Sequence, residues 1–149
     1  MSLQRLLLIV TGAHLRAETH DRPIAYRLRE RVVERLTARF GPEKHGRPHP
    51  LAPVVCSDLW YLNNEPLRTR PTVAIGGPDV NALTAYLADK LPSVLAVEDV
   101  FLVQTDPEMV DVVACCWGAD AAATLSATDA FAERYLDEFL DAALKAGTA

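Results

Sequence analysis

The sequence has little that suits a nucleic-acid-binding, disulfide-rich or membrane-spanning protein. Its 15 Lys and Arg residues are outnumbered by 20 Asp and Glu, for a formal net charge of -5, whereas phosphate binding requires a basic face. No stretch reaches the ~20 apolar residues that span a bilayer. The three cysteines, Cys56, Cys115 and Cys116, cannot all pair, and adjacent cysteines form poor disulfides. We therefore expect a cytoplasmic protein with neither nucleic-acid nor membrane partners.

The glycine fingerprints of nucleotide-binding loops are also missing. The stretch at residues 72–79, TVAIGGPD, has a strand-like run and then Gly76 and Gly77, but no third glycine and no Lys-Ser or Lys-Thr pair. A strand, a glycine turn and a helix N-terminus can still bind an anion. Asp79 in the first helical turn would instead cap the free N–H groups itself. We expect a self-capped structural turn, with a phosphate, neutral or cationic ligand as the alternatives.

Buried strands and amphipathic helices alternate along the chain. The apolar run at residues 6–11 is too short for a signal peptide and predicts a strand covered on both faces. Apolar residues recur every fourth position from Ile24 to Phe40, which predicts a helix capped by Asp21 with Pro23 in its first turn. The proline-rich stretch at residues 41–53 predicts an exposed loop.

The second half of the chain predicts a mixed sheet. Strands are expected at residues 54–55, 72–75, 100–105 and 110–117, and helices at residues 78–91 and 120–145. The link at residues 106–109 is too short for a parallel crossover, so the strands that it joins must be antiparallel. With 149 residues, half of them hydrophobic, we expect one α/β domain spanning residues 1–149. The predicted fold is a flavodoxin-like three-layer sandwich around a central mixed, mostly parallel sheet.

Charge is distributed unevenly between the two halves. Lys and Arg outnumber Asp and Glu by 12 to 7 in residues 1–75, but are outnumbered by 13 to 3 in residues 76–149. The densest run of basic residues lies in the helix at residues 26–39, and many of the acidic ones lie at residues 120–141. These could be two solvated helix faces, or faces that pair between protomers of a homo-oligomer.

Polar residues collect where the predicted parallel strands end. Carboxyl ends of parallel strands share one edge of a sheet, which is where ligands bind in open α/β folds. We expect catalytic candidates in His14, Cys56 and Asp58. The ligand-binding candidates at the same edge are Thr11, Gly76, Gly77, Asp79 and Asn81. Gln104, Thr105 and Asp106 would join them if their strand is parallel, and residues 117–120 would lie at the opposite edge.

Several chemistries remain open for this edge. Cys56 could be a nucleophile with His14 as its base, although a cysteine that ends an apolar strand is usually inert. Asp58, Asp79 and Asp106 could hold a divalent cation. His45 and His49 have a spacing that suits zinc only on a helix, which the surrounding prolines exclude. We assign no metal and leave any cofactor unknown.

The functional expectation is correspondingly broad. We expect a non-catalytic or small-ligand-binding α/β domain that self-associates through its charged faces or a sheet edge. The alternative is a small-molecule hydrolase or transferase with His14, Asp58 and Asp79 at the carboxyl ends of the strands. The aromatic and amide residues at 60–64, WYLNN, could form a recognition surface or pack as a turn.

Overall fold

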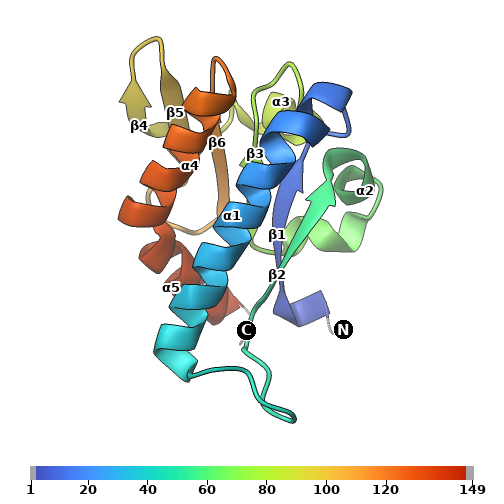
Figure 1. Ribbon diagram of the computed structural model, residues 1–149, viewed down its shortest axis with the longest axis vertical. Helices are drawn as coiled ribbons and strands as arrows, with labels where there is room; N and C mark the ends of the chain where they lie inside the picture. Colours follow the sequence, from blue (N-terminus) through green and yellow to red (C-terminus); the bar gives the residue numbers. More distant parts are fainter. Residues whose placement is uncertain (1–2, 147–149) are drawn as a thin grey trace.

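The protein is a six-stranded mixed sheet between two layers of helices (Figure 1). The computed structural model describes residues 3–146. The strands are β1 (Leu6–Thr11), β2 (Ala52–Ser57), β3 (Thr72–Ile75), β4 (Ser93–Val97), β5 (Phe101–Thr105) and β6 (Val113–Gly118). The helices are α1 (Leu15–Phe40), α2 (Asp58–Leu62), α3 (Ala82–Leu87), α4 (Ala121–Arg134) and α5 (Leu136–Ala146), with 3-10 turns η1 (Leu3–Arg5) and η2 (Glu65–Thr69).

The strand order is β2-β1-β3-β6-β5-β4, and only β5 runs against the other strands. The predicted α/β class, mostly parallel mixed sheet and flavodoxin-like layering are confirmed. Strand β1 pairs with β2 and β3 on its two sides, and its six residues are all buried. That position explains its unbroken apolar sequence, because both faces of a central strand are covered.

Each face of the sheet has its own apolar layer. Helices α1, α4 and α5 pack on one face, where Leu28, Leu36, Phe131 and Phe139 are almost wholly buried. The other face is covered by α2, α3 and η2, through residues such as Tyr61. No helix of residues 3–146 is both long enough and apolar enough to cross a membrane.

The basic and acidic segments meet within one chain. Helices α1 and α4 lie side by side on the same face of the sheet (Figure 1). Arg27 and Arg31 both contact Asp129, at 3.1 and 3.4 Å, and Arg35 contacts Asp137 at 2.9 Å. The two faces that could have joined protomers are therefore paired inside the protomer.

Strand β4 changes the expected geometry of the sheet. No strand is predicted from the sequence at residues 93–97, but β4 pairs antiparallel with β5 through a tight turn. The extra reversal makes β5 the antiparallel strand and leaves β6 parallel to β3. The predicted antiparallel pairing of the two last strands is confirmed. The expected position of residues 117–120 is wrong, because β6 ends at the same edge as β1, β2 and β3.

Two predicted helix starts are also corrected. Helix α1 begins at Leu15 with His14 as its cap, so Asp21 and Pro23 lie inside the helix. Helix α3 begins at Ala82, and Asn81 caps it in place of Asp79. The loop expected at residues 41–53 is present up to residue 51, where β2 follows, and His49 is buried in it against the Gly41 carbonyl, with Nε2 2.8 Å from the oxygen.

Candidate functional site

The loops at the carboxyl ends of β1, β2, β3 and β6 meet at one edge of the sheet. The chain leaves β1 toward β2 on one side and later crosses to β3 on the other, so the strand order reverses between β1 and β3. Ligands in open α/β sheets bind at such reversals. Gly12 lies so close to the Val80 carbonyl that an added Cβ would collide with it. The loops that follow β1 and β3 are therefore in close contact at this point.

The first depression at this edge, the His14 hollow, contains four of the predicted site residues. His14, Asp58, Asp79 and Asn81 all line it, and its volume is about 480 Å³. These side chains already have hydrogen-bond or ion-pair partners within the protein, however. His14 Nδ1 accepts a hydrogen bond from the Arg16 N–H at 3.1 Å, which caps α1.

Asp58 joins three loops. Its Oδ1 accepts from the N–H groups of Ala13 at 3.0 Å and Leu59 at 2.7 Å, and its Oδ2 accepts from Ala82 N–H at 2.7 Å. Asp58 is 4% exposed. A carboxylate with three backbone donors holds the backbone in place and has little capacity left for a substrate.

Asn81 plays a similar structural role. Its Nδ2 donates to the carbonyls of Val10 at 3.0 Å and Ile75 at 2.9 Å, and its Oδ1 accepts from the first turn of α3. The amide therefore connects β1, β3 and α3. Asp79, the residue expected to cap this helix, instead pairs with Arg16 at 2.5 Å on the surface.

Cys56 and Thr11 lie beneath the edge. Burial raises the pKa of the Cys56 thiol to about 11, so the thiol is protonated at neutral pH. Its environment gives no support to a nucleophilic role. Thr11 is fully buried, and its hydroxyl has no hydrogen-bond partner among the described residues. Neither side chain lines the His14 hollow.

The second depression, the Asp21 hollow, lies between α1, the loop after β3 and the start of α4. Its volume is about 400 Å³, and its polar lining consists of Arg16, His20, Asp21, Asp79, Asp120 and Thr124 with the backbone of Gly77. Asp120 caps α4 by accepting from Ala123 N–H at 2.8 Å. Ala121 and Ala122 also line the hollow, and their N–H groups donate no hydrogen bond to any group within residues 3–146.

Asp21 is the most unusual residue of this hollow. It is 5% exposed, and its carboxylate has no hydrogen bond or ion pair with any described residue. The carboxylate lies against Gly76, whose φ of 105° only glycine adopts readily and where a Cβ would collide with Asp21. Burial is the main reason that the Asp21 pKa is raised to about 6, and nearby His20 and Arg16 partly oppose the shift.

The Asp21 hollow does not follow from the sequence, for two reasons. The sequence pattern predicts Asp21 as a helix cap, and it predicts residues 117–120 at the opposite edge of the sheet. One signal was available: Asp21 precedes buried Ala25 and Leu28 by four and seven positions, so an acid lies on the apolar stripe of α1. Gly76, Gly77 and Asp79 do adjoin this hollow, whereas Gln104 to Asp106 lie at the opposite edge.

None of these groups forms a metal centre. Across residues 3–146, no three His, Cys, Asp or Glu side chains are grouped so that they could hold a metal ion. Asp106 is remote from Asp58, and its carboxylate accepts from Glu108, Val110 and Asp111 N–H groups, which lower its pKa.

Comparison with known proteins adds no assignment: no family model matches the chain, and no curated protein matches it.

Proposed function

We propose that this protein is a small-ligand-binding α/β domain and that its ligand occupies the Asp21 hollow. The observation that carries the proposal is the buried, unpartnered Asp21 carboxylate in the wall of a hollow at the carboxyl edge. An ionised carboxylate without a partner destabilises a fold. A ligand that donates a hydrogen bond to Asp21 would compensate for that effect.

The rest of the lining supports a polar ligand. Unpaired N–H groups at Ala121 and Ala122 offer donors, and Asp21 offers an acceptor, among the residues that line the same hollow. A few convergent polar groups in a concave site fix the orientation of a small molecule. The hydrolase or transferase alternative at His14, Asp58 and Asp79 is weaker, because Asp58 and His14 already hold backbone N–H groups.

The test is a thermal-shift screen of three proteins: the natural chain, Asp21→Asn and Asp89→Asn. Asp89 is an exposed aspartate outside both hollows and serves as the matched control. The panel contains amino acids, amines, sugars, sugar phosphates and nucleotides. A ligand at ~100 times its dissociation constant stabilises the folded state by about 2.7 kcal/mol.

We expect a ligand that stabilises the natural protein and Asp89→Asn but not Asp21→Asn. A ligand that stabilises all three proteins equally would place binding outside the Asp21 hollow. A panel that stabilises none of them would contradict the proposal and favour a protein partner.

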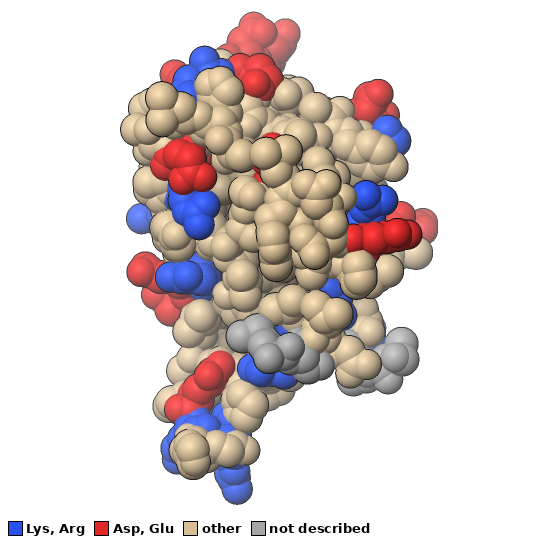
Figure 2. All heavy atoms as spheres, turned by 90° about the vertical axis from the view of Figure 1, so that its right-hand side faces the viewer, with Lys and Arg blue, Asp and Glu red and all other residues tan. Residues whose placement is uncertain are grey.

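We also propose that the chain self-associates, through the face that carries α2. Figure 2 shows that the side of the molecule to the right in Figure 1, where α2 lies, is largely free of charged side chains. Leu59 and Trp60 on α2 are 57% and 46% exposed. A two-fold contact brings a surface against itself, so an uncharged surface meets no repulsion there.

Sedimentation velocity tests this second proposal. The natural chain should form a dimer that Trp60→Glu converts to a monomer, with the far-ultraviolet circular dichroism unchanged. A natural chain that remains monomeric at high concentration would contradict it, as would a Trp60→Glu dimer.

A further inference from the structure

The carboxyl edge has more acid than base. In the Asp21 hollow, Asp21, Asp79 and Asp120 face only Arg16 and His20. Arg16 is already paired with Asp79 at 2.5 Å. The field in this hollow is therefore negative once Asp21 is ionised, and a cationic ligand is favoured over an anionic one.

The helix N-terminus does not reverse this preference. The α4 macrodipole would attract an anion, but the Asp120 carboxylate already occupies that position as the cap. A phosphate or carboxylate at Ala121 and Ala122 would meet Asp120 beside it and Asp21 in the same hollow. The N–H groups of this turn therefore suit a neutral acceptor, such as a hydroxyl or carbonyl oxygen.

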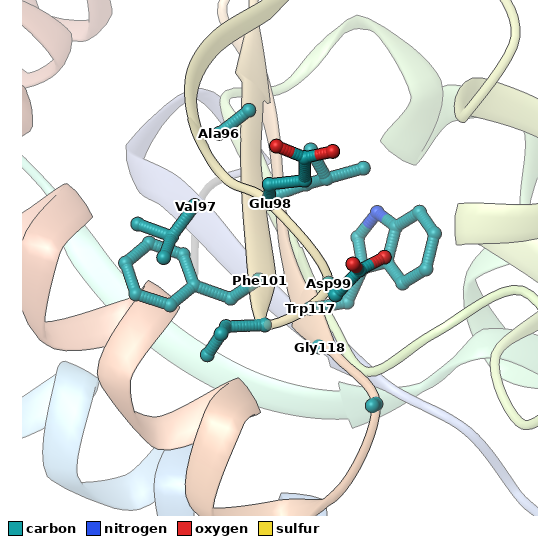
Figure 3. Close-up of a pocket in the computed structure, with 10 residues that line it drawn as sticks. Ala96, Val97, Glu98, Asp99, Phe101, Trp117 and Gly118 are labelled. Atoms are coloured by element: carbon teal, nitrogen blue, oxygen red, sulfur yellow. The ribbon is translucent and has the colours of Figure 1, made fainter.

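A third depression, the hairpin hollow, continues the edge beyond the Asp21 hollow. It lies at the β4–β5 turn, is lined by residues 96–102 and 117–119, and has a volume of about 390 Å³ (Figure 3). Gly118 and Ala119 line both hollows, so the two adjoin at the end of β6. This places an apolar surface directly beside the polar one.

The hairpin hollow combines aromatic rings with carboxylates. Glu98, Asp99 and Trp117 all line it, and Figure 3 draws the Trp117 ring on one side of the turn with Phe101 and Val97 on the other. Trp117 Nε1 donates to Gln104 Oε1 at 2.9 Å, so its ring offers only apolar surface. Glu98 and Asp99 have no hydrogen bond or ion pair with any described residue. No Lys, Arg or His lines this hollow.

We infer that the ligand is a small organic cation: its ammonium group contacts the Asp21 carboxylate, and its apolar body extends past Gly118 and Ala119 toward Trp117. This inference rests on the proposed binding function and adds the chemical class. The carboxylates of the Asp21 hollow attract the ammonium group, and the Trp117 ring in the adjoining hairpin hollow offers apolar surface to the body of the ligand. The burial of Asp21 strengthens the contact, since a desolvated ion pair is screened little.

Three probes of similar shape and different charge test the inference by isothermal titration calorimetry. They are phenethylammonium, the neutral 2-phenylethanol and the anionic 3-phenylpropionate. We expect phenethylammonium to bind at least ~10 times more tightly than the other two, since charge pairs in buried sites are worth more than one factor of ten. Asp21→Asn should remove that preference, and Asp89→Asn should retain it.

The pH dependence gives an independent readout. The groups facing Asp21 are His20 and Arg16 from α1 and Asp79 from the loop after β3, and Asp120 lines the same hollow. Because the Asp21 pKa is about 6, affinity for phenethylammonium should rise by about tenfold between pH 5 and pH 7. The same measurement on His20→Gln shows whether the pH dependence belongs to Asp21, because that variant retains the Asp21 carboxylate.

The outcomes separate the inference from the proposal on which it rests. Equal or tighter binding of the alcohol or the carboxylate, lost in Asp21→Asn, would overturn the cationic class and leave the Asp21 hollow as the site. Binding of phenethylammonium that Asp21→Asn leaves unchanged would overturn both. Failure of all three probes would also overturn the inference, while a hit in the wider screen would still support the hollow.

Discussion

The charged residues of helix α1 fall into two groups, one paired and one unpaired. Along its middle and C-terminal turns, arginines form ion pairs with aspartates of α4 and α5 on the surface, namely Arg27, Arg31, Arg35 and Arg39 with Asp129, Asp137 and Asp141. In its second turn, Asp21 is buried without a partner. The paired region serves packing between helices. The unpaired residue destabilises the fold, which is typical of a group retained for binding or catalysis.

The largest expected effect is at Asp21 itself. Asp21→Asn keeps the shape and removes the buried charge. The folded pKa of about 6 lies above the reference value of 3.8, so the folded protein loses stability relative to the unfolded chain as the pH rises from ~4 to ~6. We expect the variant to be more stable than the natural protein by up to about 3 kcal/mol above pH 7.

Urea denaturation at pH 4 and at pH 7.5 measures this difference. The gain in the free energy of unfolding should be small at pH 4, where Asp21 is protonated in the folded protein and is only partly ionised in the unfolded chain. A variant that is less stable at pH 7.5 would show that the Asp21 carboxylate has a stabilising partner.

Asn81 provides the second test, because it is a buried polar side chain with every group satisfied. The residue is 1% exposed, and its amide bonds Val10, Ile75 and the first turn of α3. Asn81→Ala leaves two buried carbonyls and a helix start without their partner, so we expect a loss of about 2–3 kcal/mol. Chemical denaturation that shows a loss under 1 kcal/mol would mean that water replaces the amide.

Asp129 is the matched counterpart of Asp21 in the paired region. Asp129→Asn removes a carboxylate shared by Arg27 and Arg31. The partners are partly exposed, so we expect a loss of only about 0.5–1 kcal/mol, which shrinks in high salt. The same substitution should therefore stabilise the protein at residue 21 and destabilise it at residue 129. The comparison between the two regions fails if both substitutions have the same sign.

The paired and unpaired regions also differ in how well the sequence predicts them. The strand at residues 72–75, the apolar stripe of α1 and the link after β5 follow from periodicity and turn chemistry, and all are present. The Asp21 hollow depends on the direction of β6, which depends on whether β4 exists. Edge strand β4 has a short sequence with no clear alternation of buried and exposed residues, so periodicity does not reveal it.

Local capping was likewise ambiguous in the sequence. Asp79 and Asn81 both suit a helix N-terminus, and only the length of the turn after Gly77 decides between them. In the structure, the N–H groups of Val80 and Asn81 both donate to the Gly77 carbonyl, so Asp79 lies within the turn that precedes the helix. The ion pair with Arg16, a tertiary contact, then determines where the Asp79 side chain lies.

The smallest expected effect is at Asp79. Both side chains of the Arg16 pair are more than half exposed, at 57% and 72%, so the pair is worth little in water. We expect Asp79→Asn to change the free energy of unfolding by less than about 0.5 kcal/mol, whereas a helix cap would be worth about 1 kcal/mol. Removing Asp79 also removes one like charge near Asp21, so the Asp21 pKa should fall slightly, which carbon-13 carboxyl titration can detect. A decrease of about 1 kcal/mol in the free energy of unfolding would show that Asp79 does cap the helix. An unchanged Asp21 pKa would show that the two carboxylates do not interact.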